Sequence, residues 1–365
     1  MQVASTVALL TSGGDGPGMN AALRAAAKTA SARGARVLGV QDGYDGLIDG
    51  RFVPLGGSAQ DGDPFDTNGL DFLAKQGGTV LGTARSERFR SAEGRARAAE
   101  QLAREGVSGL LVVGGNGSLT GAHLLAVETG VKVLGVPGSI DNDIGCTSTC
   151  IGVDTALNTI VEACDRISDT ARSHRRAFVV EVMGRQSGYL AMAAAVAVGA
   201  DAVVFREQHR EEKALVQAVA DVVRKAFSER GKRRVLILKS EGVELPTLAL
   251  VQKVEEAVKP SLPGLEIRGV ILGHLVRGGN PSFLDRMVSA RLAFAATTAL
   301  LEGASDEMVA WQSPVPGGVT TSDASVKRFP LATVLEETQR LLDGTSPVTQ
   351  RRVGLMSKVE GVLQL

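Results

Sequence analysis

The sequence contains few of the residue types that hold disulfides or transition metals. Its three cysteines cannot all pair with one another, and a chain of 365 residues does not need disulfides to be stable. None of its four histidines has metal-motif spacing to another histidine or to a cysteine. We therefore expect a reducing compartment and no transition-metal chemistry.

Charge excess and long apolar runs are also missing. The chain has 40 Lys and Arg residues and 40 Asp and Glu residues, so no net field draws it to nucleic acid or to an anionic membrane. No stretch approaches the length of about 20 apolar residues that a membrane helix needs. The N-terminal segment 1–14 is too short and too uncharged for a secretion signal. We expect a cytoplasmic protein without nucleic-acid or membrane partners.

What is present is a regular alternation of short apolar runs with amphipathic segments. The runs VALL, RVLGV, GLLVV, VKVLGV, AFVVEVM, AVVF, RVLILK and RGVIL have the pattern of strands that are buried on both faces. Segments with helical spacing lie between them, for example 20–34, 156–170, 212–229 and 284–301. This alternation predicts an α/β fold of two doubly wound, Rossmann-like domains with mainly parallel sheets.

Polar, glycine-rich turns follow several of these predicted strands. They are TSGGDGPGMN (11–20), GGNGSLTGA (114–122), PGSIDNDIG (137–145) and GHLVRGGNPSFLDR (273–286). Ligands of doubly wound sheets collect at the carboxyl ends of the strands, so these turns are the predicted sites of chemistry. In the first two, free backbone N–H groups and the positive end of a helix dipole favour phosphate. The lysine-bearing phosphate loop is absent, and neither turn has dinucleotide-binding spacing.

The turn SIDND adds two carboxylates, Asp141 and Asp143, which suit phosphoryl transfer. That reaction needs a residue that deprotonates the acceptor hydroxyl, and oxygen ligands for Mg²⁺. Arginines occur in GTARSERFR (82–90), in RSHRR (172–176) and in the segment 266–279, and guanidinium groups match the geometry of a phosphate. From the residues alone, two other interpretations stay open: an Asx-rich turn that bonds its own backbone, and arginines on a solvated face.

At this point a family resemblance emerges. LLTSGGDGPGMNAALR, GGTVLGTARSERFR, GGNGSLTGA, PGSIDNDI, HRRAFVVEVMGRQSGYLA, SEGV and LGHLVRGGNPSFLDR resemble, in order and spacing, the signature segments of the 6-phosphofructokinase family. The resemblance spans roughly residues 5–330. It implies transfer of the ATP γ-phosphate to the 1-hydroxyl of fructose 6-phosphate, with Mg²⁺ as cofactor and ATP as co-substrate.

The resemblance also implies roles for individual residues. Asp141 would be the base, assisted by Ser139 and Arg185 at the catalytic centre. The expected ATP contacts are Gly14, Arg85, Ser86, Gly115, Asn116, Gly117 and Ser118. The expected sugar-phosphate contacts are Ser139, Ile140, Asp141, Arg176, Met183, Gly184, Arg185, Glu241, Arg268, His274 and Arg277. Asn116 and Asp143 are the expected metal ligands.

Domains and assembly follow from the same resemblance. It implies a nucleotide-binding domain of residues 1–151 plus about 276–326, and a sugar-phosphate-binding domain of residues 152–275 plus about 327–365. It also implies a homotetramer or homodimer with shared active sites, in which Arg176 and Arg268 reach into the site of a neighbouring subunit.

Several positions depart from the family pattern. Asn116 stands where the family normally has aspartate, so we expect a higher Mg²⁺ requirement or a lower turnover. Gly117 and Gly138 stand where pyrophosphate-using relatives carry an acid and a lysine, which favours ATP as the donor. Ser86 replaces a residue that is often aromatic.

The expected effector site also departs from the family pattern. Arg24, Lys28, Asp201 and Arg233 lie near effector-site positions, but Ser168 replaces a common arginine. The sequence therefore leaves the allosteric effectors undetermined. Two alternative functions also remain open, a catalytically weakened sensor of sugar phosphate or nucleotide and a pyrophosphate-dependent enzyme. The tail beyond about residue 330 is expected to hold an amphipathic helix, followed by a turn with a basic end at SPVTQRR.

Overall fold

The computed structural model describes residues 5–56, 65–312, 315–323 and 325–354 of the chain. The chain forms two compact units. The first comprises Met1–Ile140, Ile144–Thr155 and Arg277–Leu341. The second comprises Asp141–Asp143, Ala156–Val276 and Leu342–Leu365. Within the described residues, no helix is both long enough and apolar enough to cross a membrane.

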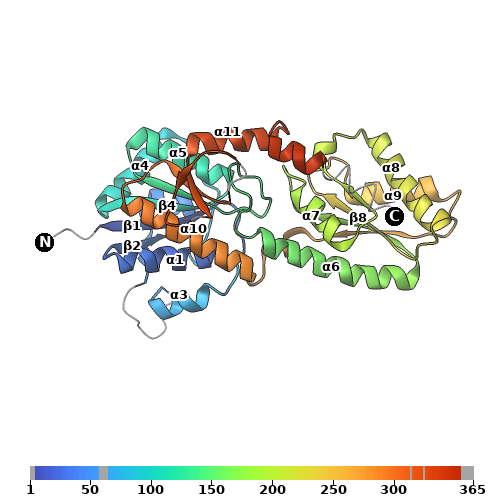
Figure 1. Cartoon of the computed structure of the whole chain (residues 1–365), viewed down its shortest axis with the longest axis horizontal. Helices are drawn as coiled ribbons and strands as arrows, with labels where there is room; N and C mark the ends of the chain where they lie inside the picture. Colours follow the sequence, from blue (N-terminus) through green and yellow to red (C-terminus); the bar gives the residue numbers. More distant parts are fainter. Residues whose placement is uncertain (1–4, 57–64, 313–314, 324, 355–365) are drawn as a thin grey trace. The chain divides into compact units, whose positions relative to one another are not determined.

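The first unit is built on a sheet of eight strands in the order β11-β12-β10-β5-β4-β1-β2-β3 (Figure 1). The strands are β1 (Thr6–Ser12), β2 (Arg36–Val40), β3 (Phe52–Pro54), β4 (Val107–Gly114), β5 (Val133–Pro137), β10 (Glu307–Trp311), β11 (Val319–Thr320) and β12 (Val326–Pro330). The central pairs are parallel, whereas β3, β11 and β12 join antiparallel at the two edges. All seven residues of β1 are buried, as expected for a strand that is covered on both faces.

Helices cover both faces of this sheet. They are α1 (Met19–Ala32), α2 (Gly43–Asp49), α3 (Thr67–Leu73), α4 (Ala92–Arg104), α5 (Asn116–Thr129), α10 (Phe283–Leu301) and α11 (Leu331–Leu342), with a 3-10 turn η1 (Arg88–Arg90). Figure 1 shows α4 and α5 on one face and α1 with α10 on the other. Small side chains let α1 approach the sheet closely, because Ala22, Ala26 and Ala30 are fully buried in the main core.

The second unit holds a sheet of four parallel strands in the order β7-β8-β6-β9. These are β6 (Ala177–Val182), β7 (Ala202–Val204), β8 (Val235–Ser240) and β9 (Ile267–Ile271). The remaining elements are α6 (Val153–His174), α7 (Tyr189–Val198), η2 (Arg206–Gln208), α8 (Glu212–Arg224), the π-helical turn η3 (Lys225–Glu229), α9 (Thr247–Val258) and η4 (Gly273–Arg277). The expected α/β class with mainly parallel sheets is confirmed.

The C-terminal part of the chain differs from the expected domain division. Residues 327–341, which we expected in the second domain, belong to the first unit. The reason is long-range pairing: β12 joins the edge of the large sheet beside β10, with Val309 opposite Arg328. The segment expected to be a basic turn is helical over residues 347–354.

Candidate active site

The first two glycine-rich turns lie against one another in the first unit. After β1, Gly13 has a φ of 89°, and a Cβ there would approach Ser118 Oγ to 3.0 Å. At the start of α1, Gly18 has a φ of 107°, and a Cβ would lie 2.8 Å from both Ile151 Cγ2 and Ser289 Oγ. These positions need glycine because of both the left-handed conformation and the close approach.

The second turn presents a helix N-terminus. Gly115 is the extended residue that precedes α5, and Asn116 is the first helical residue. The first N–H groups of a helix have no partner within it, so the N-terminus of α5 at Asn116 and Gly117 is able to bind an anion such as phosphate. Gly117 is exposed, and a Cβ there would meet no atom within 4 Å. Ser118 is buried, and the Tyr44 hydroxyl donates to its carbonyl at 2.6 Å.

The third turn lies beside the second because β4 and β5 are paired in register, with Gly114 opposite Pro137. The N–H of Gly138 donates to the Gly114 carbonyl at 3.0 Å. A Cβ on Gly115 would lie 3.6 Å from the Gly138 carbonyl oxygen and 3.9 Å from Ser139 Cβ. The expected phosphate cradle and the start of the expected acceptor turn are therefore neighbours.

The tip of this turn carries the expected base. Asp141 and Asp143 are half-buried, and Asn142 between them is buried, with a left-handed φ of 49°. Ile140 is 3% exposed, and its Cγ2 would lie 3.5 Å from a Cβ on Gly16, so its side chain packs on the first turn. This apolar contact holds Ile140, the residue that precedes Asp141 in the chain.

The expected sugar contacts in the second unit occupy two loops that bond to each other. After β6, Met183 is buried and Gly184 has a φ of 126°, where a Cβ would be 2.3 Å from the Ser187 carbonyl. After β8, the Glu241 N–H donates to the Val182 carbonyl at 2.9 Å.

The same two loops meet again one residue further on. The N–H of Gly242 donates to the Gly184 carbonyl at 3.3 Å, and a Cβ on Gly242 would lie 2.3 Å from the Arg185 carbonyl. The side chains of Arg185 and Glu241 are exposed. These two loops therefore present a cation and an anion at one edge of the small sheet.

A buried ion pair lies just beneath these loops, and the sequence analysis did not identify it. Glu181 and Lys239 are opposite each other on β6 and β8, and their side chains are 2.9 Å apart. The Lys239 side chain is 1% exposed, and Thr247 also donates to the same Glu181 oxygen. A charged residue within the apolar run VLILKS was the available signal. A buried ammonium is tolerated only with such partners, and this pair joins the carboxyl ends of the two strands.

The expected phosphate-binding arginines occupy different places. Arg176 and Arg268 lie at the amino ends of β6 and β9, where both pair with Glu266, at 2.6 and 2.9 Å. The Arg268 guanidinium, followed by that of Arg176, holds the pKa of Glu266 below its usual value. His274 lies in η4, beyond the carboxyl end of β9, and is exposed.

Arg277 lies against the first turn in the first unit. Its Nη1 donates to the Asp15 carbonyl at 3.3 Å, and a Cβ on Gly14 would lie 2.1 Å from the same nitrogen. The structure therefore brings together Gly14, expected on ATP, and Arg277, expected on the sugar phosphate. A side chain at position 14 would displace the Arg277 guanidinium from this place.

The loop that carries Arg85 and Ser86 is tied to the same turn, because Thr83 Oγ1 donates to the Gly13 carbonyl at 2.9 Å. Arg85 is exposed. The Ser86 hydroxyl bonds to Asp45 Oδ1 at 2.5 Å and accepts the Phe89 N–H at 3.1 Å. Ser86 thus orders the loop, and its hydroxyl is already engaged.

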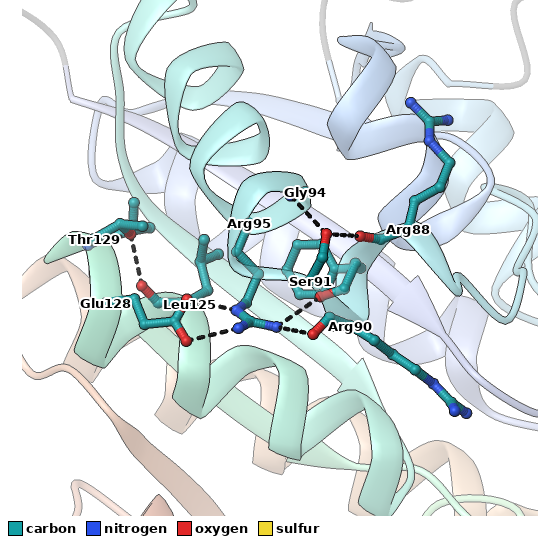
Figure 2. A network of polar contacts seen from close by, with 10 residues as sticks. Arg88, Arg90, Ser91, Gly94, Arg95, Leu125, Glu128 and Thr129 are labelled. Atoms are coloured by element: carbon teal, nitrogen blue, oxygen red, sulfur yellow. Dashed lines mark hydrogen bonds and ion pairs between the residues drawn. The ribbon is translucent and has the colours of Figure 1, made fainter.

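Arg95 secures this loop to α5, as Figure 2 shows. Its side chain is 6% exposed and pairs with Glu128 through two nitrogens, each at 2.7 Å. Its Nη1 also donates to the carbonyls of Phe89 and Arg90, at 2.9 and 2.7 Å. The ring of Phe89 stacks on Tyr44 at 3.8 Å between centroids, and burial raises the pKa of Tyr44. These contacts join the segment of Phe89 and Arg90 to α5 and to Tyr44.

The expected metal ligands offer oxygen only. Within the described residues, no group of three His, Cys, Asp or Glu side chains is arranged to hold a metal ion. Asn116 supplies an amide oxygen and Asp143 a carboxylate, which are donors that suit Mg²⁺. Since the N-terminus of α5 repels cations, Mg²⁺ fits Asn116 only together with the phosphates of a nucleotide.

Three of the four expected effector residues, Arg24, Lys28 and Asp201, are engaged in ion pairs. Arg24 and Lys28 on α1 both pair with Asp71, which lowers the pKa of that carboxyl. In the second unit, a pocket of about 340 Å³ is lined by Arg172, Asp201, Lys232, Arg233 and Arg234. Ser168, in the place of the common arginine, is buried.

Comparison with known proteins identifies the family of the chain. The family model described as Phosphofructokinase matches residues 6–300. The chain is 44% identical over 306 residues to the ATP-dependent 6-phosphofructokinase of Thermotoga neapolitana, which covers 84% of this chain and 89% of that protein. It is 41% identical over 337 residues to the enzyme of the same name from Brevibacillus brevis, covering 92% and 98%.

Solved structures of phosphofructokinases also match the chain. The phosphofructokinase from Saccharomyces cerevisiae matches with a TM-score of 0.82 and 30% identity, over 96% of this chain. That of Pichia pastoris in the T-state matches with a TM-score of 0.84 and 29% identity, over 99% of this chain. This chain spans 50% and 40% of the length of those two chains. The chain belongs to the phosphofructokinase family.

Proposed function

We propose that this chain is an ATP-dependent 6-phosphofructokinase, which converts ATP and fructose 6-phosphate to ADP and fructose 1,6-bisphosphate. The observation that carries the proposal is the 44% identity, over 84% of the chain, with a relative of that name. The reaction is a step of glycolysis, and we propose the cytoplasm as its compartment.

The local geometry supports ATP as the phosphoryl donor. The open space at Gly117, beside the N-terminus of α5, admits a nucleotide, whereas an acidic side chain there would repel its phosphates. At Gly138 a Cβ would already lie 3.1 Å from Met19 Cε and 3.5 Å from the Gly114 nitrogen. A lysine at position 138 would require a small shift of the Met19 side chain, and the glycine present here lacks the ammonium of the pyrophosphate-using pattern.

Three side chains carry the proposed phosphoryl transfer. Asp141 accepts the proton of the sugar 1-hydroxyl. The oxygen of that hydroxyl bonds to the γ-phosphorus of ATP, and the bond from the γ-phosphorus to the leaving ADP breaks. Ser139 lies beside the phosphate cradle at Gly115 and contacts the acceptor. Arg185 offers its exposed guanidinium to the transferring phosphoryl group.

Mg²⁺ would be held by Asn116 and Asp143 together with ATP, and it would neutralise phosphate charge. Gly115, Gly117 and Ser118 would bind the phosphates of ATP. Gly14 would lie under these phosphates. Arg85 and Ser86 would face the nucleotide. Because the amide of Asn116 carries no charge, it holds the metal more weakly than a carboxylate.

The sugar would contact Met183, Gly184 and Glu241, and its phosphate would bind His274 and Arg277. Arg176 and Arg268 require a second copy of the chain. They lie at the amino ends of β6 and β9, whereas Met183 follows the carboxyl end of β6. Arg176 and Met183 flank β6 and are seven rises of about 3.3 Å apart, which is roughly 23 Å and farther than one sugar monophosphate reaches. We therefore propose a homo-oligomer with shared active sites.

A coupled assay that offers ATP and pyrophosphate separately tests the proposal. We expect fructose 1,6-bisphosphate with ATP and none with pyrophosphate. Product with pyrophosphate alone would refute the donor assignment. Binding of fructose 6-phosphate without product from either donor would refute the catalytic function and favour a sensor.

A further inference from the structure

The C-terminal segment touches the turn that carries the proposed base. Residues 347–354 are helical and belong to the second unit, as do Asp141–Asp143. From this helix, Arg352 Nη1 donates to the Asn142 carbonyl at 3.3 Å. The guanidinium carbon of Arg352 also lies 4.6 Å from the centroid of the Tyr189 ring, which is within cation–π range.

These two partners belong to the two parts of the acceptor site within this unit. Asn142 is the residue between the two carboxylates, and Tyr189 is the first residue of α7, which directly follows the loop of Met183 and Gly184. One side chain therefore ties the turn of the base to the loop of the proposed sugar contacts.

The turn needs such a tie for physical reasons. Asn142 adopts a left-handed φ of 49°, a conformation that Asn tolerates better than most residues with a Cβ, so the turn is compatible with its sequence but its buried backbone groups still need partners. Asn142 is only 1% exposed, so its backbone carbonyl requires a hydrogen-bond donor from the protein. The Arg352 guanidinium supplies a donor, and it brings a positive charge to a turn with a carboxylate on either side of Asn142.

We propose that Arg352 is a positioning residue for phosphoryl transfer, which holds Asp141 in place for the acceptor hydroxyl through the Asn142 carbonyl and the Tyr189 ring. The inference rests on the proposed function and adds a role for the C-terminal segment. Misplacing a reactive group by about 1 Å costs up to about 100-fold in rate. Loss of Arg352 therefore lowers kcat and leaves ATP binding, which depends on the first unit, unchanged.

The test compares Arg352→Ala with Arg351→Ala in the full-length chain. Arg351 is the exposed neighbour on the same helix and serves as the matched control. Steady-state assays with ATP and fructose 6-phosphate give kcat and each KM. Amide hydrogen exchange of a peptide covering residues 139–146 reports the order of the turn, with a peptide from β8 as reference.

We expect Arg352→Ala to lower kcat by between about 10- and 100-fold with an unchanged KM for ATP. Exchange should accelerate in the 139–146 peptide and not in β8, and Arg351→Ala should behave as wild type. Arg352→Lys should restore part of kcat, because an ammonium can still lie over the Tyr189 ring.

Two results would overturn the inference: unchanged kcat and turn exchange in Arg352→Ala, or faster exchange throughout the second unit, which would indicate a packing role alone. If the wild type itself makes no product, the proposed function fails, and the exchange experiment still decides whether Arg352 orders the turn.

Discussion

Replacing Arg268 with alanine should weaken the binding of fructose 6-phosphate without impairing ATP binding. A hydrogen bond from a charged group contributes about 1.5 to 3 kcal/mol. At tenfold per 1.4 kcal/mol, losing one such contact raises the KM for fructose 6-phosphate by about 10- to 150-fold. Because Glu266 pairs with Arg268, as it does with Arg176, and competes with the substrate phosphate, we expect the lower part of this range for both arginines.

Arg176 should show the larger effect. Its side chain is 27% exposed against 56% for Arg268, so its bond to a phosphate is less screened by solvent. Arg166→Ala is the control, since Arg166 is exposed and pairs with Glu162 on its own helix. The assay is steady-state kinetics with fructose 6-phosphate varied at saturating ATP.

Subunit mixing shows whether these arginines act in a neighbouring site. Asp141→Asn and Arg268→Ala chains, each impaired alone, should recover activity when they are assembled together, since a hybrid contains a site with both residues intact. An unchanged KM in Arg268→Ala would refute the phosphate contact. Hybrids that form but stay inactive would refute the shared site.

Three further outcomes follow from other parts of the structure. Asn116→Asp should lower the Mg²⁺ concentration needed for half-maximal activity, because the carboxylate adds a charge that attracts the cation; an unchanged Mg²⁺ titration would contradict this. Burial raises the pKa of Cys146 to about 12 and that of Cys164 to about 11, from 9.0, so the folded state retains these protons. The protonated thiols therefore add to the free energy of unfolding. This contribution is complete below pH 9 and is lost as the pH rises through 11 to 12. At pH 8 the native thiolate fraction is about 1 in 1,000 to 1 in 10,000, against about 1 in 10 when unfolded. Mass spectrometry after iodoacetamide treatment should therefore show labelling of both cysteines in urea only, and rapid native labelling would contradict the burial argument. Arg95→Met should reduce the free energy of unfolding by about 2 to 4 kcal/mol, since two carbonyls lose their buried donor; urea denaturation with an unchanged midpoint would contradict the supporting role.

The local part of this site could be predicted from the sequence. Glycine-rich turns after apolar runs determine where strands end and helices begin, so the turns at Gly13, Gly115 and Gly138 were identifiable. Their side-by-side arrangement follows from parallel pairing, which places successive carboxyl ends at one sheet edge.

The long-range part could not be predicted in this way. Nothing local in residues 327–341 reveals that β12 pairs with β10, and nothing in SPVTQRR reveals that Arg352 meets Asn142. Arg277 and Gly14 were assigned to different ligands because their contact joins distant segments of the chain. Side chains expected to face ligands, such as Ser86, also have partners that only the folded chain provides.

The most direct test of the proposed mechanism is the Asp141→Asn substitution. Turnover with ATP and fructose 6-phosphate is measured beside calorimetric titration of fructose 6-phosphate. A general base contributes about 100- to 10,000-fold, so kcat should fall by that factor while the dissociation constant for fructose 6-phosphate stays near the wild-type value. A variant that retains wild-type kcat, or that loses turnover only because it no longer binds fructose 6-phosphate, would contradict the assignment of Asp141 as the base.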